Sequence, residues 1–142
     1  MFIIQETPID TISLRNSHQD PKNGAFVAFE GIVRADSHDN SQVNGLLYHA
    51  DKEACAAEGQ TILKEVLSLF PLTHAACVQR IGKLNVGDIA IWIGVWAGHR
   101  DEAYKGSRYI IEEIKKRLLV WKKEFHADGS SKWVHGTETI TL

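Results

Sequence analysis

The chain has 142 residues, of which 44% are hydrophobic and 24% charged, and its net charge is −2. This length suits one domain over residues 1–142, and the composition excludes disordered, collagen-like and low-complexity proteins. A slightly acidic chain has no general attraction to nucleic acid or to anionic membranes, so an anionic ligand must be met by a local basic cluster. The longest apolar run, from Ile89 to Ala97, is too short to cross a bilayer, and the N-terminus has no signal-peptide pattern.

Hydrophobic periodicity predicts an α+β domain with a mainly antiparallel sheet and two principal helices. Residues 1–23 carry no diagnostic pattern, and we expect an edge strand and a linker there. The elements expected after them are strands at 24–34 and 43–49, a helix at 52–69, a strand at 75–81, a connection at 82–88, a strand at 89–97, a helix from 98–102 to about Leu119, and strand segments at 132–134 and 137–142. The strand at 89–97 is apolar on both faces, which predicts a central strand covered on both sides.

Positive charge is concentrated in the last third of the chain. Of sixteen Lys and Arg residues, eight fall between Arg100 and Lys123, where only four acidic residues accompany them. The eight are Arg100, Lys105, Arg108, Lys115, Lys116, Arg117, Lys122 and Lys123. This segment is therefore the candidate for meeting an anionic ligand.

His99 and Arg100 lie where the most apolar strand meets the N-terminus of the second helix. Backbone N–H groups and the helix dipole favour an anion at such a junction, and we expect a phosphate or a carboxylate there. Arg34 ends an earlier strand, where its forked guanidinium could hold the same kind of group. The alternative for His99 and Arg100 is a solvent-exposed junction in which Arg100 pairs with a nearby acid, and Arg34 alone is a weak signal.

Lys115 and Lys122 are seven residues apart, which on a continuous helix is two turns and places both ammonium groups on one side. Lys115 adjoins the apolar stripe, so its stem can pack there while its head enters a cleft, whereas Lys116 and Arg117 are expected to point to water. A partly desolvated lysine among like charges can act as an acid, a base or a nucleophile. The ordinary alternative is a solvated helix face.

The sequence lacks the signatures of several other enzyme classes. The patterns GxSxG, GxGxxG and GxxxxGK[ST] do not occur. The seven histidines form no close ligand pair with Cys or Asp, so neither a metal nor another cofactor is expected. Cys55 and Cys77 lie in expected buried elements, which indicates reduced core thiols in a cytoplasmic protein.

Short motifs follow one another in order from about Gly24 to Val134. They are FxGxVR at Phe29–Arg34, RIGxL at Arg80–Leu84, HRxxAY at His99–Tyr104, Lys115 seven residues before the first lysine of WKKE at Trp121–Glu124, and WV at Trp133–Val134. This ordered set resembles the family of the catalytic large subunits of molybdopterin synthase, although residues 1–23 are only weakly covered. The resemblance implies an α/β hammerhead fold and a sulfurtransferase of molybdenum cofactor biosynthesis.

The resemblance also implies partners, a substrate and site residues. It implies a homodimer within a heterotetramer, in which each large subunit binds a small ubiquitin-like sulfur carrier through a C-terminal Gly-Gly thiocarboxylate. The substrate would be cyclic pyranopterin monophosphate, which becomes the molybdopterin dithiolene, and Lys115 and Lys122 would be catalytic. The substrate-binding positions that it implies are Ile32, Val33, Arg34, His99, Arg100, Lys115, Lys122, Lys123 and Glu124.

Two positions depart from the family pattern. Gln79 stands where the family often has His, and Leu118–Val120 replaces a common aliphatic-Pro-aromatic turn. Without that proline the second helix could run further and move Lys122 relative to Lys115.

Two other functions remain open at the level of sequence. A non-catalytic binding module would dock an acidic protein tail or nucleic acid on the basic segment, and its affinity would fall with salt and survive the loss of Lys115. A different phosphate-handling enzyme would use the His99-Arg100 junction for a nucleotide, although no nucleotide-loop motif accompanies it.

Overall fold

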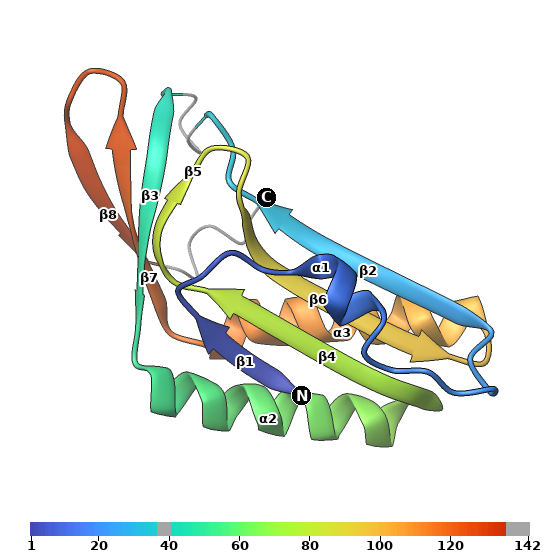
Figure 1. Ribbon diagram of the computed structural model, residues 1–142. Helices are drawn as coiled ribbons and strands as arrows, with labels where there is room; N and C mark the ends of the chain where they lie inside the picture. Colours follow the sequence, from blue (N-terminus) through green and yellow to red (C-terminus); the bar gives the residue numbers. More distant parts are fainter. Residues whose placement is uncertain (37–40, 136–142) are drawn as a thin grey trace.

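Two β-sheets and three helices build the protein, which a computed structural model describes over residues 1–36 and 41–135 (Figure 1). In chain order the elements are β1 (Phe2–Gln5), α1 (Thr11–Arg15), β2 (Ala25–Ile32), β3 (Val43–Ala50), α2 (Lys52–Leu69), β4 (Leu72–Arg80), β5 (Gly82–Asn85), β6 (Ile89–Ala97), α3 (Arg100–Arg117), β7 (Val120–His126) and β8 (Ser131–His135). The predicted α+β class is confirmed.

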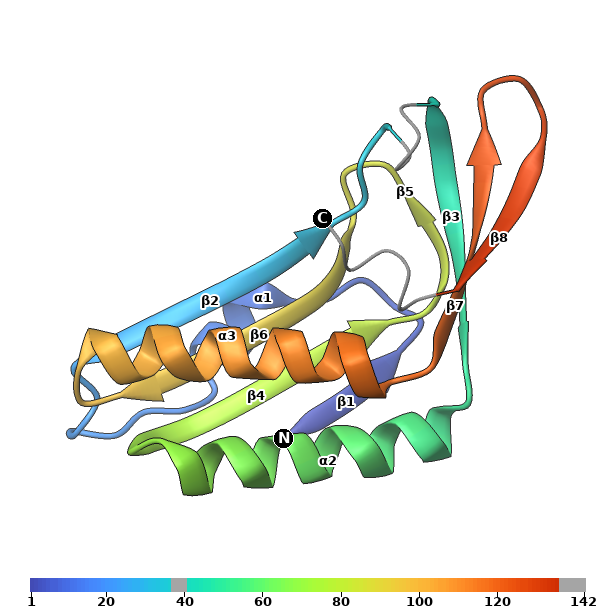
Figure 2. The same cartoon turned by 180° about the vertical axis from the view of Figure 1, so that it is seen from behind.

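The strands form two four-stranded sheets. The first has the order β1-β4-β6-β2 and the second the order β5-β3-β7-β8. β1 runs parallel to β4, and the other pairs within the described ranges are antiparallel. Figure 2 shows α2 and α3 side by side on one face of the first sheet, with the second sheet standing at its end. The space where the two sheets meet therefore borders the C-terminal end of α3.

β6 is buried on both faces, as its sequence predicted. Ile93 and Val95 belong to the main core under the long helices, whereas Trp92 and Trp96 pack on the other face with Ala76. Both tryptophans are about 1% exposed. Gly94 lies between them, and a Cβ atom there would meet the Trp92 ring, so the missing side chain makes room for the indole.

Two long helices are joined by ion pairs. α2 begins after Asp51, whose carboxylate accepts a hydrogen bond from the Ala54 amide at 3.1 Å. From α3, Arg117 reaches Glu58 and Glu65, each at 2.6 Å. The expectation that Arg117 points to water is therefore wrong: its side chain is 26% exposed, because the facing helix offers it carboxylates.

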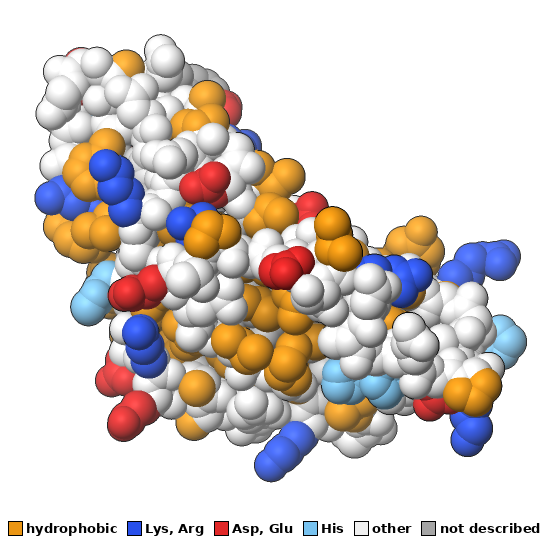
Figure 3. Space-filling view, in the orientation of Figure 1, with side chains coloured by type: hydrophobic (Ala, Val, Ile, Leu, Met, Phe, Trp, Pro, Cys, Tyr) orange, Lys and Arg blue, Asp and Glu red, His pale blue; other side chains and the backbone are white. Residues whose placement is uncertain are grey.

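The N-terminal segment contains one element more than predicted. β1 is the expected edge strand of the first sheet. The short α1 follows, capped by Asp10, which accepts a hydrogen bond from the Ser13 amide at 3.0 Å. Five residues are too few to show helical periodicity, so the sequence did not reveal this helix. Figure 3 shows hydrophobic side chains on the face that carries α1, with charges of both signs scattered around them.

Two further strands differ from expectation. Residues 82–85 form β5, which pairs with β3, instead of a plain connection. Residues 120–126 form β7, which directly follows the end of α3. β8 confirms the strand expected at 132–134, whereas the strand expected at 137–142 lies outside the described residues.

Within residues 1–36 and 41–135, no helix is both long and apolar enough to span a membrane. Cys55 and Cys77 are buried and free. Burial raises the pKa of both thiols, which agrees with the prediction of unreactive core cysteines.

Candidate active site

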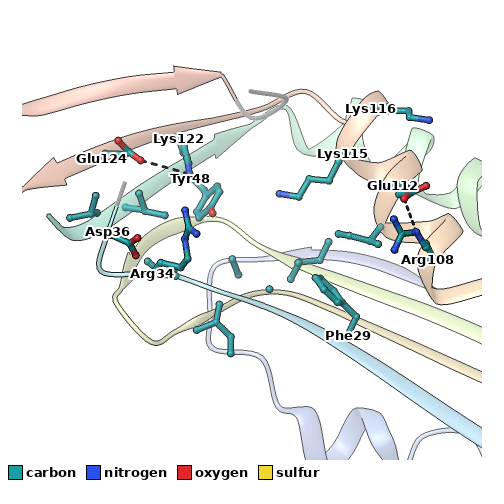
Figure 4. Close-up of a pocket in the computed structure, with 18 residues that line it drawn as sticks. Phe29, Arg34, Asp36, Tyr48, Arg108, Glu112, Lys115, Lys116, Lys122 and Glu124 are labelled. Atoms are coloured by element: carbon teal, nitrogen blue, oxygen red, sulfur yellow. Dashed lines mark ion pairs between the residues drawn. The ribbon is translucent and has the colours of Figure 1, made fainter. Parts of the chain in front are cut away.

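A pocket of about 690 Å³ opens between the two sheets and the C-terminal half of α3, a size that suits a small organic substrate. Figure 4 shows Arg34, Lys115 and Lys122 pointing toward one another inside it. Arg34 follows β2, Lys115 lies on α3, and Lys122 lies on β7. Three basic residues from distant parts of the chain thus share one cavity.

The backbone around Arg34 is held by the turn between β5 and β6. The Val33 amide donates to the Asp88 carbonyl, and the Gly87 amide donates to the Val33 carbonyl, both at 2.9 Å. The register between β2 and β6 shifts at Gly31/Ile32, where the pairing ends. The chain leaves the sheet here, which brings Arg34 in front of the second sheet.

The sequence left open whether one helix carries both Lys115 and Lys122. α3 ends at Arg117, and the chain becomes extended at Leu118, so the two lysines do not share a helix. β7 then pairs antiparallel with β3, with Lys122 opposite Tyr48. The strand therefore carries Lys122 back toward the end of α3, and the helix does not run on to Lys122 although the family proline is absent.

The two lysines influence each other's protonation. Burial lowers the pKa of Lys115, and the charge of Lys122 lowers it further. Burial also lowers the pKa of Lys122, while Glu124 raises it and Arg34 lowers it. A cluster of this kind can hold an anion and can also move a proton more readily than exposed lysines.

Acidic residues lie at the edges of the cationic cluster. Glu124 is 4% exposed, and its carboxylate is 3.9 Å from the Lys122 ammonium group. Asp36 and Glu112 also line the pocket, and Glu112 pairs with Arg108 on the same helix at 2.9 Å. The cations of the cluster are thus only partly neutralised.

The remaining site residues expected from the sequence divide into two groups. Ile32 and Val33 line the pocket. Lys123 instead lies over the Phe125 and Trp133 rings, 5.7 Å from each centroid, on the opposite face of the second sheet. This chain does not bring Lys123 into its own pocket.

His99 and Arg100 also lie away from this chain's pocket. They stand at the N-terminal end of α3, and Arg100 is fifteen residues before Lys115. At the usual rise per residue this is about 22 Å along the helix. No residue of the His99-Arg100 junction lines the pocket of the same chain.

Several pocket residues were not foreseen. Tyr48 stands beside Lys122, and burial, followed by the charge of Glu124, raises the pKa of Tyr48 to about 12. Phe29 and Ile111 supply an apolar wall. Ile111 lies four residues before Lys115, so helical spacing could have indicated it, whereas Tyr48 depends on a strand pairing that the sequence does not reveal.

Comparisons with known proteins agree on one family. The family described as "MoaE protein" matches residues 4–117. The molybdopterin synthase catalytic subunit of Thermoplasma volcanium is 35% identical over 130 residues, covering 92% of this chain and 94% of the relative. That of Synechococcus elongatus is 38% identical over 130 residues, covering 91% and 78%.

Solved structures point to the same family. Molybdopterin synthase from Staphylococcus aureus superposes with a TM-score of 0.85 at 35% identity, covering 92% of this chain and 94% of that one. A complex of subunits 1 and 2 of the molybdopterin-converting factor from Helicobacter pylori has a TM-score of 0.74 at 20% identity, which shows a shared fold. The chain belongs to the MoaE family, whose members are the catalytic subunits of molybdopterin synthase.

Proposed function

We propose that this chain transfers sulfur from the thiocarboxylated C-terminus of a small carrier subunit to cyclic pyranopterin monophosphate, forming the molybdopterin dithiolene. The observation that carries the proposal is the convergence of Arg34, Lys115 and Lys122 in one pocket. Substrate and thiocarboxylate are both anionic, so both need basic partners on a chain whose net charge is −2. The family indicates which reaction is catalysed, and the pocket is where we expect that reaction to occur.

In this proposal Lys115 is the central catalytic residue. The carrier's sulfur forms a bond to a substrate carbon as a carbon–oxygen bond at that carbon breaks and the oxygen leaves. Water then cleaves the acyl–sulfur bond, so the sulfur stays on the substrate and the carrier leaves as a carboxylate. A second thiocarboxylated carrier supplies the second sulfur of the dithiolene in the same way. Each step moves a proton near the reacting atoms, and a buried lysine with a lowered pKa can give or take it. Lys122 assists by holding negative charge, and Arg34 binds the phosphate.

The partner is a small carrier subunit, as the family implies. The Helicobacter pylori structure is described as a complex of two subunits of the converting factor, which supports this kind of assembly. The carrier's flexible tail would enter the pocket, so that its thiocarboxylate meets the cationic cluster. Lys123 and its aromatic neighbours lie outside the pocket, and any role of Lys123 would be at the mouth or with the carrier.

The role assigned to His99 and Arg100 requires a second copy of the chain. These residues are about 22 Å from Lys115 along α3, so one small substrate cannot touch both ends on one chain. In a symmetric homodimer, the partner's α3 could bring its N-terminal end to this pocket. We therefore place His99 and Arg100 in the site of the neighbouring chain.

The edge of the first sheet offers a route to such a dimer. β2 is an edge strand of eight residues, with Phe29 37% and Ile32 54% exposed. Antiparallel pairing of two copies of β2 would set the start of one strand beside the end of the other. The start of β2 is tied to the end of β6, just before His99, because the Gly24 amide donates to the Ala97 carbonyl. The end of β2 leads to Arg34, so this pairing would join the two halves of the site.

Turnover of the reconstituted complex tests the proposal. Molybdopterin formation is followed with the chain, a thiocarboxylated small subunit and cyclic pyranopterin monophosphate. Lys115→Ala is expected to lower kcat by at least about 100-fold, the usual contribution of an acid–base group. Lys64→Ala, an exposed lysine on α2, serves as the matched control and should keep full activity. Normal turnover by Lys115→Ala would contradict the assignment and favour a binding module.

A further inference from the structure

Gln79 is a buried polar residue that the proposed function leaves without a role. It lies on β4 and is 6% exposed. Its Nε2 atom donates to the backbone carbonyls of Arg80 and Ala90, both at 3.0 Å. Both amide hydrogens are thereby used, which leaves Oε1 as the atom that can still accept a hydrogen bond. Within residues 1–36 and 41–135, no group donates to this oxygen.

A small cavity of about 30 Å³ lies beside Gln79. Tyr48 and Lys115 line both this cavity and the large pocket, so the two spaces adjoin at these residues. The remaining lining residues are apolar, and they come from β6 and from the segment between the last turn of α3 and the start of β7. Three polar side chains therefore meet at one small space with apolar walls.

Tyr48 and Lys115 also have unused hydrogen-bonding capacity. In the part of the chain that the structure describes, neither the Tyr48 hydroxyl nor the Lys115 ammonium group makes a hydrogen bond or an ion pair. Burial raises the pKa of Tyr48 to about 12, so the hydroxyl keeps its proton and can donate it in a hydrogen bond near neutral pH. A buried water molecule needs about 10–15 Å³ and two to four polar partners, and this cavity offers both.

We propose that the small cavity holds one ordered water molecule and that Gln79 is a positioning residue, which anchors Lys115 through that water. The water donates a hydrogen bond to Oε1 of Gln79 and accepts hydrogen bonds from the Tyr48 hydroxyl and the Lys115 ammonium group. A lysine stem is long and flexible, and the anchor directs the other N–H groups of Lys115 to the large pocket. The effect on turnover rests on the proposed function, whereas the hydration site does not.

A crystal structure of the unmodified chain, at a resolution that shows ordered water, tests the hydration site directly. We expect one water within about 3.2 Å of Gln79 Oε1, Tyr48 Oη and Lys115 Nζ. Gln79→Met keeps a side chain of similar length but removes the acceptor, so the water should be lost from its structure. A cavity without water in the unmodified chain, or the same water in Gln79→Met, would overturn the proposal.

Turnover with a thiocarboxylated carrier and cyclic pyranopterin monophosphate tests the positioning role. Gln79→Met should lower kcat about tenfold, the equivalent of one hydrogen bond to a charged group. KM should change little, because the substrate does not touch Gln79. Gln79→His introduces the residue of the family pattern, and it should return kcat to within about twofold, since a neutral imidazole has one nitrogen that donates and one that accepts. A Gln79→His variant as slow as Gln79→Met would count against the shared acceptor role.

A double-mutant cycle separates this role from a merely structural one, in which Gln79 only holds the Arg80 and Ala90 carbonyls. Tyr48→Phe removes the hydroxyl alone, and it should lower kcat about tenfold because the same water loses a partner. If both residues act through one water, the double variant should also be about tenfold slower, whereas independent effects would make it about 100-fold slower. Independent effects would overturn the shared water.

Gln60 on α2 provides the matched control, because its Nε2 atom also donates to a backbone carbonyl, that of Phe2 at 3.2 Å. Gln60→Met should keep full turnover, and thermal unfolding checks that every variant is folded. An equal loss of kcat in Gln60→Met would attribute the effect to a lost backbone contact and contradict the role of Gln79. If the water is present in the unmodified chain and lost in Gln79→Met, but no turnover occurs with a matched carrier, the proposed function fails and the anchoring of Lys115 stands.

Discussion

Glu65 is a residue at which acid stability can be tested. Its carboxylate accepts hydrogen bonds from Arg117 at 2.6 and 2.9 Å and from the Tyr109 hydroxyl at 2.7 Å. Hydrogen bonds from Arg117, followed by that from Tyr109, lower the pKa of Glu65 from 4.5 to about 2. The folded state therefore binds this proton more weakly than the unfolded state does.

The stability that Glu65 contributes should be present above about pH 4.5 and be lost as the pH falls through about 2. Glu65→Gln should unfold at a lower temperature than the unmodified chain near neutral pH, and the difference should vanish in strong acid. Thermal unfolding followed by circular dichroism across this range measures it. Glu30→Gln, an exposed position on β2, is the control and should show a smaller difference. An equal pH dependence for both variants would contradict the role of Arg117.

Packing between β1 and α2 depends on a glycine. A Cβ atom on Gly59 of α2 would come within 2.5 Å of the Phe2 ring on β1. Phe2 is 5% exposed, so the ring has little room to move away. β1 and α2 therefore pack this closely because residue 59 has no side chain.

Gly59→Ala should lower the free energy of unfolding by about 1–2 kcal/mol, because the cost of overpacking exceeds the gain in helix propensity. In a Phe2→Ala background the same change should instead stabilise the chain by about 1 kcal/mol, since the clash is gone. Chemical denaturation of the four proteins in this cycle measures the coupling between the two positions. If Gly59→Ala destabilises both backgrounds equally, the contact with Phe2 is not the cause.

The elements show which parts of the fold periodicity can predict. α2, α3 and β6 carry repeated apolar residues, and their positions were predicted within a few residues. β5 is too short to show a period, and no element was predicted at residues 120–126, where β7 follows α3 after two residues. The burial of Leu118 and Val120 explains why the helix stops without a proline, and burial is a property of the tertiary structure.

Only part of the site could be predicted, because the rest depends on which strands pair. The sequence pointed to Lys115, Lys122 and Arg34 through their residue types and through the family resemblance, and all three line the pocket. It left open whether one continuous helix carries both lysines, and the structure shows that strand pairing brings them together. Tyr48 was missed for the same reason, since no local pattern states which strands will be neighbours.

At the scale of the whole molecule, variants at the two ends of α3 test whether residues from two chains build one site. If His99 and Arg100 act in the pocket of the partner, Arg100→Ala and Lys115→Ala damage each site from different chains. A hybrid dimer of these two variants then has one site with both changes and one site with neither. Mixing the two inactive proteins should therefore restore activity, to about a quarter of the normal level when the chains mix at random.

A matched mixture tells this restoration apart from general effects of mixing. Lys115 and Lys122 line the same pocket of the same chain, so every site in a hybrid of Lys115→Ala and Lys122→Ala lacks one of them. That mixture should stay inactive under the same unfolding and reassembly conditions. Restoration in the first mixture alone would support a site built from two chains, with β2 edges as the expected contact. Inactivity in both mixtures, with hybrid formation verified by mass spectrometry, would contradict a site built from two chains. Normal turnover by Arg100→Ala alone would instead remove Arg100 from the site, from which about 22 Å of helix separates it on its own chain.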